Sequence, residues 1–217
     1  EPSAQAMAAV MHPAKGQWPS YNGTTAGNRY SPLDQINRSN VRGLALQWSF
    51  TPGGAGLQTT PVVADGVMYV TGAAQVCALD ARTGRRIWCS PRTAPKVGAG
   101  PGRITGFSAP ATGGANRGVA LLGDRLFFST DDAHLVALNR VTGAVMWAVA
   151  LPDPKYPGAY YGAAAPLVVG DLVIAGVAGG DSPLRGFVAA YKASTGEQVW
   201  RLWTIPLPGE PLSETWK

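Results

Sequence analysis

The sequence predicts an all-β protein built as a β-propeller, and three observations lead to this prediction. A hairpin phrase occurs three times, each copy having an apolar strand, a turn that ends in Thr-Gly, and a second strand that carries a tryptophan. The tryptophans are Trp88, Trp147 and Trp200, at intervals of 59 and 53 residues, close to the ~40–50 residues of one propeller blade. Finally, 28 glycines and 18 prolines separate many short apolar strands, as in turn-rich all-β folds.

The three copies of the phrase cover residues 78–84, 137–143 and 190–196. In each copy the glycine can adopt the positive φ that a bulged hairpin turn requires, and in the first two an Asp or Asn that opens the turn can bond its own backbone. A tryptophan at one fixed place in every copy predicts a ring that packs between neighbouring sheets.

The order of segments divides the chain in two. Residues 1–17 are rich in alanine and are expected to form an arm or a short helix lying on the body, and residues 18–217 are expected to form an incomplete propeller domain. Within it, a turn-rich stretch at 18–48 precedes three units, and a connector rich in proline and glycine follows them. The units open with strand pairs at 60–70, 118–129 and 165–176, and the connector covers 206–211.

Three units and part of a fourth cannot close a ring, because propellers need ~4–8 blades and an open ring leaves its edge strands unpaired. We therefore expect another polypeptide, or another copy of this one, to complete the propeller.

Composition excludes several classes of function. Hydrophobic residues make up 46% and charged residues 14% of the chain, without an apolar run long enough for a transmembrane helix. The net charge of +5 is scattered and lacks the clustered basic and aromatic residues of a nucleic-acid surface. We therefore predict neither a transmembrane segment nor a nucleic-acid partner.

Cys77 and Cys89 flank the turn of the first copy and are expected to lie about opposite each other on adjacent strands. A disulfide there would require an oxidising compartment. Two alternatives remain open, a cross-strand disulfide and a pair of buried free thiols.

Several short motifs occur in order after residue 17. They are Trp18 with Asn22-Gly23, RYSPL at 29–33, QIN at 35–37, NRGVA at 116–120, and RGFVAAY at 185–191. Together these motifs resemble the pyrroloquinoline quinone (PQQ) dependent alcohol dehydrogenases, the methanol-dehydrogenase-like quinoproteins of the bacterial periplasm. The resemblance implies the N-terminal part of an eight-bladed propeller, about three to four four-stranded blades with tryptophan-docking repeats. It also implies a periplasmic location, with an export signal already removed before Glu1.

The resemblance further implies a reaction. Such enzymes oxidise an alcohol or aldehyde and pass electrons to a cytochrome c. PQQ accepts the hydride, a calcium or lanthanide ion stabilises the developing oxyanion, and an Asp removes the proton. The catalytic Asp belongs to sequence that follows residue 217, so no catalytic residue is expected within this chain.

The same resemblance assigns site residues. Arg117 stands at the position of a guanidinium that contacts the cofactor, a role suited to its fixed fork of donors, and the alternative is an arginine that bonds loop carbonyls. Gln58, Gly179 and Gly180 stand at further cofactor positions. Asp181 stands where the family has a metal-binding Glu, and the alternative is an Asp that caps its loop.

The sequence also departs from the family. Ala111-Thr112 replace the vicinal cysteines that cover one face of the cofactor, and Gln58 replaces a Glu found in many members. Ala163 and Ala178 replace hydroxyl residues that bond the cofactor's carboxylates. An alternative function is therefore a non-catalytic propeller that acts as a scaffold or interaction subunit. We interpret Asp131 and Asp132, beside His134, as turn-forming residues.

Overall fold

A computed structural model describes residues 2–53, 57–72, 75–90, 116–156, 158, 160–178, 184–211 and 213–215. In this part of the chain the strands form three four-stranded antiparallel sheets, each in sequence order from its first to its last strand. The first sheet contains β1 (Val62–Ala64), β2 (Val67–Thr71), β3 (Val76–Asp80) and β4 (Arg86–Cys89). The second contains β5 (Ala120–Leu122), β6 (Arg125–Ser129), β7 (His134–Asn139) and β8 (Val145–Ala150). The third contains β9 (Leu167–Val169), β10 (Leu172–Gly176), β11 (Phe187–Lys192) and β12 (Gln198–Trp203).

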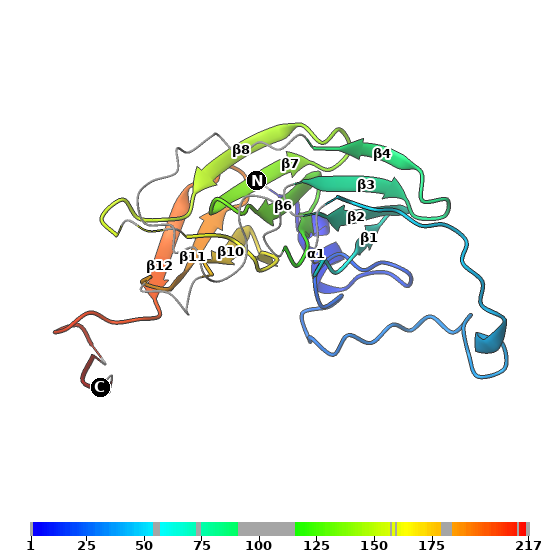
Figure 1. Ribbon diagram of the computed structural model, residues 1–217, viewed down its shortest axis with the longest axis horizontal. Helices are drawn as coiled ribbons and strands as arrows, with labels where there is room; N and C mark the ends of the chain where they lie inside the picture. Colours follow the sequence, from blue (N-terminus) through cyan, green and yellow to red (C-terminus); the bar gives the residue numbers. More distant parts are fainter. Residues whose placement is uncertain are drawn as a thin grey trace.

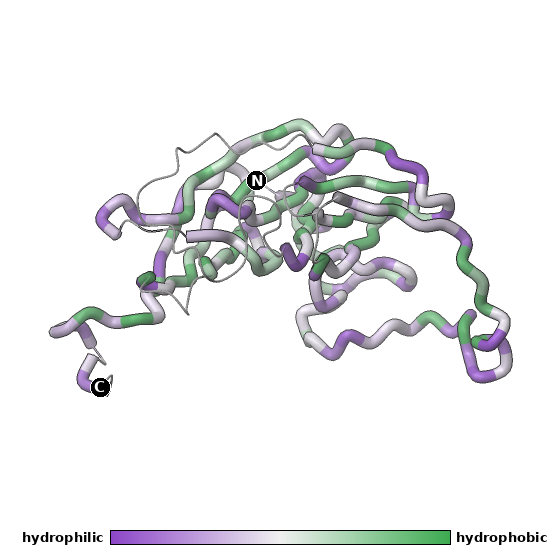
Figure 2. The backbone as a smooth tube through the Cα atoms, viewed as in Figure 1, coloured by the Kyte–Doolittle hydropathy of each residue, from purple (hydrophilic) through white to green (hydrophobic). Residues whose placement is uncertain are grey.

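The three sheets stand beside one another in an arc, with β4, β8 and β12 on its outer side (Figure 1). On the inner side, β5 contacts β9 of the next sheet. Hydrophobic stretches follow the strands, and hydrophilic residues gather at the turns that join them (Figure 2). This arrangement confirms the prediction of a partial β-propeller.

Strand alternation builds the core, because successive side chains of a strand point to opposite faces of its sheet. In β6, Phe127 is buried between the second and third sheets, whereas its neighbours Leu126 and Phe128 are buried between the first and second. In β7, Leu135 likewise faces the third sheet and Val136 faces the first. The middle sheet is therefore buried on both faces, which explains why its inner strands read as continuous apolar runs.

Two of the three predicted tryptophans, Trp88 and Trp147, lie on the glycine turn of the next sheet. A Cβ on Gly143 would stand 2.7 Å from the ring of Trp88, and one on Gly196 would stand 2.8 Å from Trp147. The indole nitrogens of Trp88 and Trp147 also donate to backbone carbonyls of those turns, at 3.2 and 3.1 Å. One tryptophan outside the predicted phrase repeats this contact, since Trp48 lies in the same way on Gly84, the glycine of the first copy.

The third sheet leaves one apolar face uncovered. Trp200 pairs with Ala190 as Trp147 pairs with Ala137, so it occupies the docking position of the third sheet. Its side chain is 40% exposed, and Leu202 on the same face is 63% exposed. No glycine turn covers this tryptophan within the described residues.

The N-terminal segment forms helix α1 (Ala4–Met11), capped by the Ser3 hydroxyl, which accepts from the Ala6 amide. The helix contacts β5. Two short 3₁₀ helices, η1 (Val41–Gly43) and η2 (Ser213–Thr215), occur in the connecting segments. Among the described residues, every helix is too short or too polar to cross a membrane.

Cys77 and Cys89 are direct cross-strand partners on β3 and β4. A disulfide joins them in the structure, which corresponds to the first of the two alternatives considered from the sequence. Cys77 is fully buried and packs with Leu79 and Val70 against Trp48.

Replacing Gly143 with alanine tests the docking contact, and Gly170 supplies the matched control. Both glycines have positive φ, at 74° and 60°, so alanine costs about 1 kcal/mol of backbone strain at either position. Only Gly143 lies under a tryptophan, whereas space around Gly170 is open. Urea unfolding is expected to show that Gly143→Ala loses about 1–3 kcal/mol more stability than Gly170→Ala, because the ring must shift. Equal losses would contradict the docking account.

Candidate functional site

The described residues among the sequence-predicted cofactor positions lie at the ends of the sheets where the first strands begin. Gln58 precedes β1, Arg117 precedes β5, and Ala163 precedes β9. Backbone hydrogen bonds connect the segments that precede β1, β5 and β9, and so link the three sheets. The Thr60 amide donates to the Arg117 carbonyl at 3.1 Å, and the Arg117 amide donates to the Ala163 carbonyl at 3.0 Å. The structure therefore brings Arg117 and Ala163 together on one rim, which we call the entry rim.

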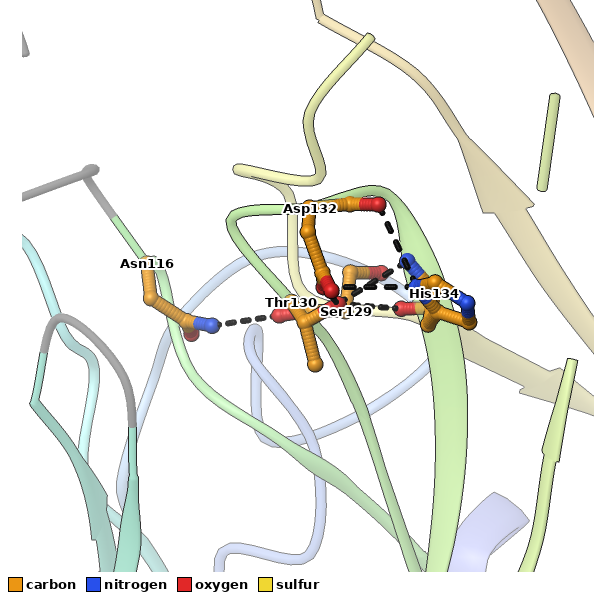
Figure 3. A network of polar contacts seen from close by, with 5 residues as sticks. All are labelled: Asn116, Ser129, Thr130, Asp132 and His134. Atoms are coloured by element: carbon orange, nitrogen blue, oxygen red, sulfur yellow. Dashed lines mark hydrogen bonds and ion pairs between the residues drawn. The ribbon is translucent and has the colours of Figure 1, made fainter. Parts of the chain in front are cut away.

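Asn116 holds the backbone beside Arg117. Its side chain is buried, and its Nδ2 donates to the Ser129 carbonyl at 2.7 Å (Figure 3). Its Oδ1 accepts from the Gly118 amide at 2.9 Å. The Thr71 hydroxyl donates to the Asn116 carbonyl at 3.4 Å. One side chain thus ties the segment before β5 to the end of β6. Sequence reasoning quoted Asn116 only as part of a motif and missed this role.

Two glycines allow the sheets to approach each other at the entry rim. Gly118 has a φ of 123°, and a Cβ there would lie 2.8 Å from the Thr60 carbonyl oxygen. A Cβ on Gly162 would lie 2.5 Å from the Cβ of Ser129. Any side chain at either position would push neighbouring strands apart.

The side chains at the entry rim differ in their exposure to solvent and in their hydrogen-bonding groups. Arg117 is exposed, and its guanidinium has no hydrogen-bond or ion-pair partner among the described residues. Gln58 is also exposed, whereas Ala163 is buried and Ala178 is half-buried, its amide donating to the Tyr161 carbonyl at 2.8 Å. Gly179, Gly180 and Asp181 lie outside the described residues, as do Ala111 and Thr112.

Tyr21 and Arg29 also belong to this region, although sequence reasoning did not single them out. The guanidinium of Arg29 lies over the ring of Tyr21, 4.5 Å from the ring centroid, and its Nε donates to the Asn22 side chain at 2.9 Å. A hydrogen bond from Arg29 lowers the pKa of Tyr21, and the charge of Arg117 acts in the same direction. Both guanidiniums are therefore close enough to act on one phenol.

Asp132 and His134 form a polar pair at the loop between β6 and β7 (Figure 3). The imidazole Nδ1 lies 3.3 Å from the carboxylate, which also accepts a hydrogen bond from the Thr130 hydroxyl. Burial opposes ionisation of Asp132, yet the hydrogen bonds from His134 and Thr130 outweigh it and lower its pKa. The hydrogen bond to Asp132 outweighs burial and raises the pKa of His134. These residues form part of a turn, as the sequence indicated, and the ion pair is an addition to that interpretation.

The arrangement favours binding of an anion over metal ligation. Among the described residues, the donors at the entry rim are guanidiniums, an amide and a phenol, all of which suit carboxylate oxygens. Within the described ranges, no three His, Cys, Asp or Glu side chains gather as a metal ion would require. A metal ligand role for Asp181 stays a prediction.

Comparisons with known proteins agree with this geometry. A family described as the β-propeller domain of PQQ-dependent glucose, ethanol and alcohol dehydrogenases matches residues 18–217. The chain is 40% identical over 200 residues to quinohemoprotein alcohol dehydrogenase ADH IIB of Pseudomonas putida, covering 91% of this chain and 27% of that protein. It is 42% identical over 183 residues to quinoprotein alcohol dehydrogenase PedH of Pseudomonas putida, covering 82% of this chain and 29% of that protein.

Solved structures give the same result. Quinohemoprotein alcohol dehydrogenase from Comamonas testosteroni superposes with a TM-score of 0.78 and 37% identity, over 96% of this chain and 32% of that one. A europium-containing methanol dehydrogenase superposes with a TM-score of 0.74 and 31% identity, over 90% of this chain and 33% of that one. The chain thus spans between a quarter and a third of the length of these proteins.

The Asp132–His134 pair predicts a pH-dependent contribution to stability. Because the folded pKa of His134 is raised, its contribution is complete below the unfolded histidine pKa of ~6.5 and is lost as pH rises through the folded value. Because the folded pKa of Asp132 is lowered, its contribution is present above ~3.9 and is lost as pH falls through the folded value. The pair therefore stabilises the fold most between about pH 4 and 6.5.

Chemical unfolding of His134→Gln at pH 6 and pH 9 checks this window. The substitution is expected to cost about 0.5–1 kcal/mol more at pH 6 than at pH 9. In an Asp132→Asn background, which lacks the carboxylate that faces His134, the same substitution is expected to cost the same at both values. A pH-independent loss in His134→Gln would show that the pair is not charged in the folded protein.

Proposed function

Because the chain belongs to the family of PQQ-dependent glucose, ethanol and alcohol dehydrogenase β-propeller domains, we propose that it supplies the N-terminal part of a PQQ-dependent dehydrogenase. Its substrate is an alcohol or aldehyde, in keeping with the relatives that are alcohol dehydrogenases. Electrons leave the reduced cofactor to a cytochrome c. The proton-accepting Asp is supplied by propeller sequence outside this chain.

The position of Arg117 carries this proposal. Hydrogen bonds from both of its backbone groups fix it between the first and third sheets, and its guanidinium is left exposed at the entry rim. A fixed fork of donors suits the carboxylates or quinone oxygens of PQQ. Arg117 would therefore orient the cofactor, with Gln58 as a neutral donor beside β1. When bound, PQQ supplies the two-electron acceptor of the reaction.

Further propeller sequence must complete the ring. The apolar face that carries Trp200 and Leu202 is open, and at the other end Trp48 docks on Gly84 from a segment outside the three sheets. Each of the three docked tryptophans, Trp48, Trp88 and Trp147, lies on the glycine turn of a sheet. By the same contact, Trp200 requires the glycine turn of a further blade. We propose that further propeller sequence supplies it.

The remaining assignments follow from the same proposal. Asp181 would ligate the calcium or lanthanide ion, and one relative of known structure contains europium. The Cys77–Cys89 disulfide favours an oxidising compartment, so we place the protein in the periplasm.

A second candidate function is a non-catalytic scaffold subunit. It is favoured by Ala163, which is buried at the entry rim and offers no side-chain donor where the family has a hydroxyl. Each hydrogen bond lost in this way removes roughly 0.5–1.5 kcal/mol from cofactor binding. In this case Arg117 and the tryptophan contacts would serve assembly alone.

Native mass spectrometry of the assembly as isolated separates the two candidates. A dehydrogenase is expected to carry the mass of PQQ together with further propeller sequence, and Arg117→Gln is expected to weaken PQQ binding ~10-fold or more, because a charged hydrogen-bond donor is lost. Arg82→Gln, in the exposed turn of the first hairpin, is the control and should keep wild-type affinity. An assembly without cofactor that also fails to take up added PQQ would favour the scaffold.

A further inference from the structure

The N-terminal arm (residues 1–17) and the segment that continues it to Arg29, together called the arm below, cross the inner strands of the first two sheets. Trp18 pairs with Val63 of β1 through two backbone hydrogen bonds of 2.7 and 2.9 Å. The Pro19 carbonyl accepts from the Leu121 amide of β5 at 3.3 Å. The Gln17 side chain accepts from the Asp65 amide at the turn between β1 and β2. The arm therefore runs antiparallel to β1, from the turn end of the sheets toward the entry rim.

This path brings Tyr21 to Arg117. Tyr21 stands in the turn closed by the hydrogen bond from the Gly23 amide to the Ser20 carbonyl, three residues after the bridge from Trp18 to Val63 at the start of β1. The Thr60 amide in turn donates to the Arg117 carbonyl. A hydrogen bond with Thr60 and the charge of Arg117 both act on the phenol of Tyr21, which agrees with a position beside the start of β1.

Arg29 returns to the same place from further along the chain. Its backbone has a φ of 53°, a left-handed conformation that residues with a Cβ seldom adopt and that clusters at functional sites. This turn and the bond to Asn22 hold the guanidinium over the Tyr21 ring. The ion pairs among the described residues involve other basic residues, so the charges of Arg29 and Arg117 stay uncompensated there.

We propose that Tyr21 and Arg29 complete, with Arg117, a carboxylate-binding subsite at the entry rim. The two guanidiniums supply charge, and the phenol donates its hydroxyl hydrogen to the bound oxygen. The identity of the carboxylate as one of those on PQQ rests on the proposed function. The arm is then part of the binding site as well as a structural segment.

Binding of PQQ to the complete assembly tests the contribution of each side chain. Tyr21→Phe removes only the hydroxyl and Arg29→Gln only the charge, and each is expected to weaken PQQ binding ~10-fold. The controls are Tyr30→Phe, whose side chain is 71% exposed, and Arg42→Gln, in the exposed helix η1. Both controls are expected to bind PQQ as the wild type does.

A second measurement needs no cofactor. The near-ultraviolet phenolate absorbance of wild type minus that of Tyr21→Phe reports the titration of Tyr21, with and without pyridine-2,3-dicarboxylate. A carboxylate in the subsite is expected to raise the pKa of Tyr21, because a nearby negative charge disfavours the phenolate.

The outcomes separate the subsite from the proposed function. Weakened PQQ binding in both variants, with a raised Tyr21 pKa, supports both. PQQ binding that is unchanged in Tyr21→Phe and Arg29→Gln overturns the subsite and leaves the dehydrogenase proposal standing. A raised Tyr21 pKa in an assembly that binds no PQQ supports the subsite and overturns the cofactor assignment. A pKa that the dicarboxylate leaves unchanged, without PQQ binding, overturns both.

Discussion

The contact between a tryptophan ring and the glycine turn of the next blade is the constraint on which the rest of the structure depends. It fixes the distance and angle between neighbouring sheets, because the turn glycine has positive φ and no Cβ under the ring. Once the sheets are fixed, alternating side chains of β6 and β7 fill the space on both of their faces. In the first sheet, the buried Cys77 of the disulfide packs against Trp48, which makes the same kind of contact.

The fixed sheets in turn create the entry rim. Their first strands begin side by side, so that Thr60, Arg117 and Ala163 bond one another through their backbones. Gly118 and Gly162 permit this approach, and buried Asn116 holds the segment between them. The rim thus presents an arginine on a rigid support, which is what recognition of a flat anionic cofactor requires. The arm adds Tyr21 and Arg29 by running along β1.

The sequence was sufficient to predict the features that depend on the pattern of neighbouring residues along the chain. Alternation and turn residues predicted the hairpins, and the position of the cysteines around one turn placed them opposite each other. Contacts between distant segments were not predictable in this way. Tyr21 reaches Arg117 only because the arm pairs with β1, and Asn116 bonds the end of β6 only after the sheet has formed. The sequence around Asp132 indicates only a turn residue. Its ion pair with His134 depends on burial in the folded loop, which the local sequence does not show. The role of Asp181 remains a prediction.

Oxidative footprinting of Trp200 tests the central claim most directly. Trp200 is 40% exposed on the open face of the third sheet, whereas Trp88 is docked on Gly143. If another blade covers that face, mass spectrometry will show that the two tryptophans are oxidised equally slowly in the intact assembly and equally fast after unfolding. Trp200 that is oxidised much faster than Trp88 in the intact assembly would contradict the claim that a further blade completes the propeller.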